Sequence, residues 1–123
     1  MARILILEDE PLIAMMLADW IDELGHEIVG PVHAIDTALA AVTSQSFDAA
    51  IIDINIGYQQ SYPVADVLVT RQLPFAFATG DSPDSIEERF TGCSTLAKPY
   101  DFDTFQRVVD NLLARPGAKR PAV

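Results

Sequence analysis

The chain has 123 residues, half of them hydrophobic, so it is long enough for one domain with a sizeable core and too apolar to be disordered. Its net charge of −10 argues against sequence-independent binding to nucleic acid, which needs a basic surface, and favours proteins or cations as partners. One cysteine excludes a disulfide framework, and neither a membrane span nor a signal peptide is visible, so we expect a soluble cytoplasmic protein.

Short apolar runs alternate along the chain with segments of helical periodicity. Runs that are apolar throughout, rather than alternating, are typical of a parallel sheet that is covered by helices on both faces. The sequence therefore predicts an α/β fold, a single doubly wound domain around a five-stranded parallel sheet with helices on both faces. The expected strands are residues 4–7, 28–32, 49–52, 75–78 and, more weakly, 95–97.

Local signals mark where three helices begin. Pro11 stands at the first position of a helix that ends before Gly25, a usual pairing of start and stop residues. Ser82 precedes a predicted helix at 84–90, and Asp101 precedes the last helix. In the first helix one face holds Leu12, Met16, Trp20 and Leu24, and in the last helix the inward stripe is Phe105, Val108, Val109 and Leu112.

Polar residues follow the predicted strands at the ends where parallel sheets carry their functional groups. Glu8 and Asp9 follow the first strand, Asp53 the third, Thr79 the fourth and Lys98 the fifth. If the strand order is flavodoxin-like, 2-1-3-4-5, the first and third strands are neighbours and their three acids converge. Such a cluster stays ionised only when a cation compensates it, and hard oxygen ligands suit Mg²⁺.

Each of these residues also has an ordinary structural interpretation. Glu8 and Asp9 could simply stabilise the start of a helix, and Asp53 could form a turn before Asn and Gly. Thr79 could cap a turn, and Lys98 could be a solvated lysine. Their joint placement at one edge of the sheet favours a site, because Lys98 is the one lysine before residue 119.

Four motifs together resemble the receiver domain of response regulators in two-component signalling. They are "ILILEDEP", an aspartate after "AAII", "FATG" and "AKP". The resemblance covers about residues 3–114 and implies a receiver domain at 1–114, followed by a flexible tail at 115–123. No effector domain follows residue 114, so we expect output through contacts with other proteins.

By this resemblance Asp53 is the phosphoacceptor, and Glu8, Asp9 and Asp53 bind Mg²⁺ together with the main-chain carbonyl of Asn55. The donor is expected to be a phosphohistidine of a sensor histidine kinase or a phosphotransfer protein. Beyond assisting its own phosphorylation and dephosphorylation, the chain is not expected to be an enzyme.

The resemblance also assigns roles to the residues of the other two strand ends. Thr79 supplies a hydroxyl that hydrogen-bonds the phosphoryl group, and Lys98 is the charge partner of that group. The Lys98-Pro99 bond is expected to be cis. Gly80 and Asp81, just beyond Thr79, are candidate positions for tuning the lifetime of the phosphoryl group.

The sequence departs from the receiver pattern at two positions. Thr95 replaces the aromatic residue that most receivers carry three residues before the lysine, so the usual aromatic switch is in doubt. Gly57 replaces a common proline, and residues 57–63 are expected to form a polar, mobile loop. The motif "PFAFATG" is similar to the FATGUY subgroup of stand-alone receivers, whose kinases belong to the HWE and related families, although Asp81 and Ser82 stand where that subgroup has an aromatic.

Three other classes of protein share parts of this pattern. A flavin-binding module would need a loop rich in Gly, Ser or Thr where "EDEP" stands, and these acids would repel a phosphate. An aspartate-based phosphatase generally has a second Asp at position 55, and here the residue is Asn55. A receiver that docks without regulated phosphorylation is the more serious alternative. Whether or not phosphorylation regulates the receiver, we expect its output surface to comprise the predicted helix at 84–90, the last strand at 95–97 and the last helix.

Overall fold

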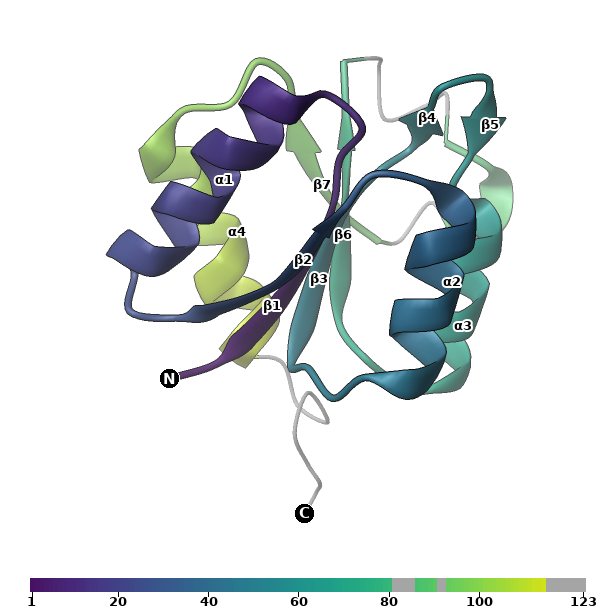
Figure 1. Ribbon diagram of the computed structural model, residues 1–123, viewed down its shortest axis with the longest axis horizontal. Helices are drawn as coiled ribbons and strands as arrows, with labels where there is room; N and C mark the ends of the chain where they lie inside the picture. Colours follow the sequence, from purple (N-terminus) through teal and green to yellow (C-terminus); the bar gives the residue numbers. More distant parts are fainter. Residues whose placement is uncertain (81–85, 91–92, 115–123) are drawn as a thin grey trace.

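The computed structural model describes residues 1–80, 86–90 and 93–114 (Figure 1). Asp81 and Ser82, which the sequence analysis singled out, lie outside the described residues, as does the tail at 115–123. All residues at the predicted strand ends are described.

Five parallel strands form the central sheet, in the order β2-β1-β3-β6-β7. Counted along the chain within this sheet, that order is 2-1-3-4-5, so the flavodoxin-like prediction is confirmed. The central strands β1 and β3 are neighbours, with Leu7 opposite Ile52. The strands are β1 (Arg3–Leu7), β2 (Glu27–Val32), β3 (Ala49–Asp53), β6 (Phe75–Thr79) and β7 (Ser94–Ala97).

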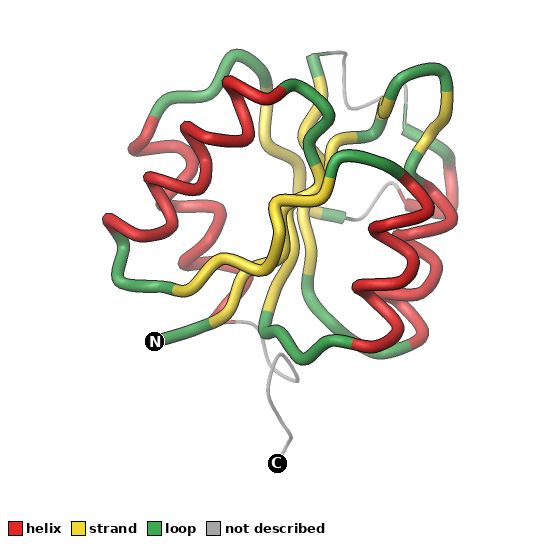
Figure 2. Tube along the Cα trace, in the orientation of Figure 1, coloured by secondary structure: helices red, strands yellow, loops and turns green. Residues whose placement is uncertain are grey.

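Helices cover both faces of this sheet, as the uninterrupted apolar strands predicted. In Figure 1, α1 and α4 lie on one side of the sheet, and α2 and α3 lie on the other. Figure 2 shows the same arrangement along the Cα trace. No helix in the described ranges is long and apolar enough to span a bilayer. The helices are α1 (Pro11–Glu23), α2 (Ile35–Ser44), α3 (Tyr62–Thr70) and α4 (Phe102–Ala114).

Alternation along β1 divides the buried side chains between two cores. Ile4 and Ile6 pack with the α1 and α4 side, whereas Leu5 and Leu7 pack with the α2 and α3 side. All of these side chains are buried, which is why β1 reads as a continuous apolar run. The sheet is thus packed on both faces, and this packing positions its carboxyl edge, where the predicted site residues lie.

The predicted helix boundaries are largely confirmed. Pro11 is the first residue of α1, and Gly25 follows its end with a φ of 82°, a conformation that glycine adopts without strain. Asp101 caps α4, because its Oδ1 accepts a hydrogen bond of 2.7 Å from the Thr104 N–H. The apolar stripe of α4 faces the core as expected. Phe105, Val109 and Leu112 are fully buried, and Val108 is partly buried.

The predicted face of α1 is correct only in part. Leu12 is 77% exposed, and the residues that α1 buries fully are Ala14, Leu17 and Ile21. The other predicted members of the face, from Met16 to Leu24, pack at the border of the core. Ala14, Leu17 and Ile21 therefore define the face of α1 that meets the sheet, and Leu12 lies outside that face.

The polar loop predicted at residues 57–63 is wrong in two respects. Its last residues belong to α3, which begins at Tyr62. Its first residues belong to a short antiparallel hairpin, β4 (Asn55–Ile56) and β5 (Gln59–Gln60), with Gly57 at its turn. Gly57 has a φ of 61°, so its identity fits the left-handed turn. Ile56 of β4 is buried in the core on the α2 and α3 side, so the hairpin is anchored to that core.

The helix that was predicted at 84–90 is not present in the described part of that segment. Residues Glu88–Phe90 form a single 3₁₀ turn, in which the Phe90 N–H donates to the Glu87 carbonyl. The Glu87 N–H donates instead to the Tyr62 hydroxyl, 3.1 Å away. Phe90 stacks on Tyr62 with ring centroids 5.5 Å apart, so aromatic packing replaces regular helical bonding here.

Candidate functional site

The predicted site residues meet at the carboxyl edge of the sheet. Asp53 is the last residue of β3, and Glu8 and Asp9 follow the neighbouring strand β1. Thr79 ends β6, and Lys98 directly follows β7. The strand order therefore brings together residues that lie as much as 90 positions apart in the chain, from position 8 to position 98.

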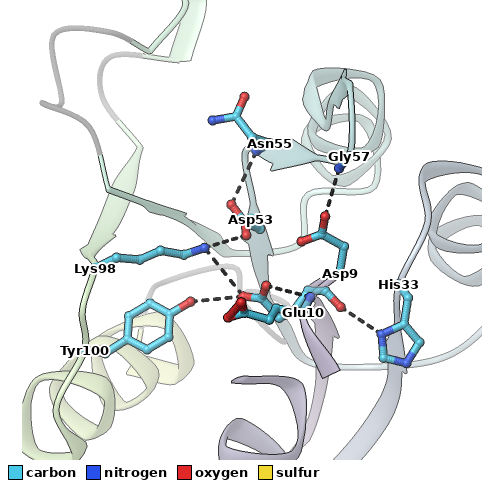
Figure 3. Close-up of polar contacts among 9 residues, drawn as sticks. Asp9, Glu10, His33, Asp53, Asn55, Gly57, Lys98 and Tyr100 are labelled. Atoms are coloured by element: carbon cyan, nitrogen blue, oxygen red, sulfur yellow. Dashed lines mark hydrogen bonds and ion pairs between the residues drawn. The ribbon is translucent and has the colours of Figure 1, made fainter. Parts of the chain in front are cut away.

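Lys98 connects two of the three acids. Its Nζ lies 2.6 Å from Asp53 Oδ2 and 3.7 Å from Glu8 Oε1 (Figure 3). Both carboxylates are buried, at 4% exposed for Asp53 and 1% for Glu8. Asp9 is exposed at the rim of the cluster. The site thus has a buried floor, which the lysine neutralises in part, and an acidic mouth that is open to solvent.

The three acids fit the requirements of a hard divalent cation. Glu8, Asp9 and Asp53 each offer a carboxylate oxygen, and these oxygens lie within 4.8 Å of one another. Three carboxylates against one lysine leave an excess of negative charge at this site. Oxygen ligands from a few carboxylates, with room for water on the open side, match the coordination of Mg²⁺. These residues therefore fit the cation that the resemblance implied.

Burial sets the acid–base behaviour of the two inner carboxyls. Burial raises the pKa of both Glu8 and Asp53, and their mutual repulsion adds to the effect on Glu8. The hydrogen bond from Lys98 opposes this shift at Asp53, and the Glu10 N–H opposes it at Glu8. Burial alone would lower the pKa of Lys98, but the hydrogen bond and charge of Asp53 raise it, so the lysine stays a cation.

Main-chain amides orient the acids from the outside of the cluster. The Gly57 N–H, in the turn of the hairpin, donates to Asp9 Oδ2 at 2.9 Å, and the Glu10 N–H donates to Glu8 Oε2 at 3.1 Å. Gly57 was singled out only as a departure from the family pattern. A proline at position 57 would lack this N–H. The sequence held no signal for these contacts, because any residue other than proline supplies an amide.

Tyr100 is the side chain of this site that sequence reasoning missed. Its hydroxyl donates to Glu8 Oε1 across 3.4 Å, and the ring stands beside Lys98 (Figure 3). Burial, and then the charge of Glu8, raises the pKa of Tyr100, so its hydroxyl keeps its proton. The sequence signal that could have identified Tyr100 is its position two residues after Lys98, at the same edge of the sheet.

The remaining predicted residues lie around this cluster. The Asn55 N–H donates to Asp53 Oδ1 at 3.3 Å, while the Asn55 side chain points away from the acids (Figure 3). Thr79 is 4% exposed, and its carbonyl accepts a hydrogen bond from the Lys98 N–H. A Cβ at Gly80 would lie 4.0 Å from the Cβ of Lys98, so the two positions are in contact range.

Two further residues from the sequence analysis, Thr95 and Pro99, lie in or just after the last strand, β7. Thr95 is half-buried in β7, opposite Phe77 of β6. The Lys98-Pro99 bond is cis, as the resemblance implied. The turn at Pro99 lies between Lys98 and Tyr100, both of which contact the acids.

Comparison with known proteins agrees with this fold. The solution structure of SdrG from Sphingomonas melonis Fr1 is 45% identical, has a TM-score of 0.81, and covers 93% of this chain and 98% of that chain. The response regulator TrrA from Thermotoga maritima, solved in complex with Mg²⁺-BeF, is 26% identical with a TM-score of 0.81, over 92% of this chain and 100% of that one.

Among curated proteins, the phyllosphere-induced regulator PhyR of Methylorubrum extorquens is 33% identical over 116 residues, which make up 90% of this chain and 43% of PhyR. The chain spans about half the length of the curated relatives it matches. No family model matches the chain.

The fold and the site together define a class of protein. A doubly wound sheet in the order 2-1-3-4-5, with three acids and a lysine at the carboxyl ends of its strands, is the architecture of a receiver-type signalling domain. With the relatives described above, the chain belongs to the receiver domains of response regulators in two-component signalling.

Proposed function

We propose that the chain is a stand-alone response regulator that accepts a phosphoryl group on Asp53 from a sensor histidine kinase or a phosphotransfer protein. One observation carries the proposal. Asp53 is a buried carboxylate 2.6 Å from Lys98 Nζ, and it shares an oxygen cluster with Glu8 and Asp9. A nucleophilic carboxylate beside a fixed cation, within a set of cation ligands, suits the transfer of an anionic group.

The transfer forms one bond and breaks another. An Asp53 oxygen attacks the phosphorus of a phosphohistidine, the phosphorus–nitrogen bond breaks, and the imidazole leaves and takes up a proton. The product is an acyl phosphate on Asp53. Glu8, Asp9, Asp53 and the Asn55 carbonyl would hold Mg²⁺, which would supply positive charge against the transferred oxygens.

Lys98 and Thr79 would complete the contacts of the phosphoryl group. Lys98 already pairs with Asp53, so its ammonium can follow the new oxygens with little movement. Thr79 ends β6 beside β3, within the same edge, and its hydroxyl would donate to the phosphoryl group. Four neighbouring positions remain predictions for tuning the behaviour of the phosphoryl group: Gly80, Asp81, Thr95 and Pro99.

The output is proposed to be a contact with a protein effector in the cytoplasm. Phosphorylation adds charge and acceptor oxygens at Asp53, and a response of Thr79 to them biases the adjoining surface. That surface comprises β7, α4 and the turn at 86–90. Within the family, "PFAFATG" and the missing aromatic at Thr95 support the FATGUY subgroup with an HWE-type kinase.

Incubation with a small phosphoryl donor tests this function. The purified chain is mixed with Mg²⁺ and acetyl phosphate or phosphoramidate, and its intact mass is measured beside an Asp53→Asn control. We expect one added phosphoryl group on the wild type, and none on the variant or in chelator. If several donors leave the folded wild type unmodified, the docking module that acts without phosphorylation replaces this proposal.

A further inference from the structure

The Glu8 carboxylate is held at both of its oxygens. Oε2 accepts a hydrogen bond of 3.1 Å from the Glu10 N–H, on the side toward α1. Oε1 faces Tyr100 Oη at 3.4 Å and Lys98 Nζ at 3.7 Å. Lys98 lies closer to Asp53, at 2.6 Å, so it is shared between the two acids. Tyr100 is therefore an uncharged side chain that bonds Glu8 from outside the acid cluster.

Packing fixes the ring that carries this hydroxyl. Tyr100 is half-buried and packs against the core on the α1 and α4 side of the sheet. Its ring lines a groove together with Ile13 and Met16 of α1 and with Pro99. Because the ring packs against this core, contacts other than the bond to Glu8 help to set the position of the hydroxyl.

We propose that Tyr100 is a positioning residue of the cation site, whose hydroxyl holds Glu8 in the orientation that faces Asp9 and Asp53. The inference rests on the proposed function, because it assigns a residue to the Mg²⁺ site on which that function depends. It adds a side chain outside the acid cluster, two positions beyond Lys98.

The physical reason is preorganisation. A carboxylate without an outer partner turns freely and must be ordered when the cation binds, whereas a held carboxylate is already in place. Removal of such outer partners commonly weakens metal binding by about 10- to 100-fold. The contact here is long at 3.4 Å, and Glu8 keeps its Glu10 and Lys98 partners. We therefore expect a loss at or just below the lower limit of that range, about fivefold to tenfold.

Tyr100→Phe is the test, because it removes the hydroxyl and keeps the ring. The matched control is Tyr58→Phe, since Tyr58 is fully exposed at the turn of the hairpin. Mg²⁺ is titrated calorimetrically into the wild type and both variants without a phosphoryl donor. The expected result is a Kd raised by about fivefold to tenfold in Tyr100→Phe and unchanged in Tyr58→Phe.

A second substitution separates positioning from a general structural effect. In a Glu8→Ala background the side chain that Tyr100 orients is absent, so adding Tyr100→Phe should change the Kd no further. An equal loss in both backgrounds would show that Tyr100 acts elsewhere and would overturn the inference.

The outcomes distinguish this inference from the proposed function. If the wild type binds Mg²⁺ and Tyr100→Phe binds it equally well, the role of Tyr100 is wrong and the phosphoacceptor proposal stands. If the wild type binds no Mg²⁺ at all, both are wrong. Saturable binding that only Tyr100→Phe weakens supports both.

Discussion

Lys98→Met tests how much the lysine stabilises the acid pair. At 2.6 Å and an effective dielectric constant of about 20, the attraction between Lys98 and Asp53 is about 6 kcal/mol, and at 3.7 Å that between Lys98 and Glu8 is about 4.5 kcal/mol. Desolvation of the charges offsets most of this gain. Removing one member of a buried pair commonly costs about 3 kcal/mol, which corresponds to a fall of roughly 10 °C in Tm for a domain of this size.

Denaturant unfolding in chelator, at about pH 7 and about pH 5, measures this loss. Without Lys98 the buried acids escape their repulsion only by taking up a proton, and their raised pKa values make this easier at the lower pH. We expect the loss of stability to shrink at pH 5. Adding Asp53→Asn to Lys98→Met should recover part of it at pH 7, because an uncharged amide needs no partner cation.

The control is Arg107→Met, which removes an exposed cation on α4, far along the chain from the acids. It should change the free energy of unfolding by less than about 0.5 kcal/mol. If Lys98→Met unfolds at the same denaturant concentration as the wild type, or loses the same stability at both pH values, the electrostatic reasoning about this site is refuted.

Three further outcomes follow from the same structure. Mg²⁺ at about 100 times its Kd should add about 2.7 kcal/mol to the free energy of unfolding, and chelator should remove this gain; an unchanged Tm would contradict the cation site. In chelator, the raised pKa values of Glu8 and Asp53 mean that the folded state binds more protons, so their contribution to stability is present at low pH and lost as pH rises through the folded-state pKa values. Urea unfolding across that range should show the decline, and a rise would reverse the sign of the argument. Leu17→Ala should cost about 3 kcal/mol and Leu12→Ala less than about 0.5 kcal/mol, since the first is 1% exposed and the second 77%; equal losses would disprove the orientation of α1.

The sheet was predictable because its strands carry a strong physical signal. Residues 49–52 are apolar without alternation, and β3 is indeed buried on both faces. That reading placed Asp53 at a strand end, and the order of strands then brought it beside Glu8 and Asp9. The acid cluster could therefore be predicted from topology alone.

The face of α1 was harder, because the helix is apolar on more than one side. Leu12, Met16 and Trp20 follow helical spacing as well as Ala14, Leu17 and Ile21 do. Periodicity cannot choose between two such stripes, and the choice depends on where the sheet lies beneath the helix.

The hairpin and the Tyr100 contact depend on geometry that spacing does not encode. Strands as short as Asn55–Ile56 fall below the length at which alternation can be recognised. The Tyr100 ring reaches Glu8 because of how the chain turns at Pro99, and the Gly57 amide reaches Asp9 because of the turn of the hairpin. In each case the deciding factor is the path of the backbone.

The measurement that tests the central claim most directly is the location of the phosphoryl group. After incubation with Mg²⁺ and acetyl phosphate, borohydride reduces an acyl phosphate to an alcohol with release of phosphate, and peptide mass mapping identifies the residue. The account predicts conversion of Asp53 to homoserine in the wild type, dependent on Mg²⁺. Reduction at Asp9 or at another acid, with Asp53 unmodified, would contradict it.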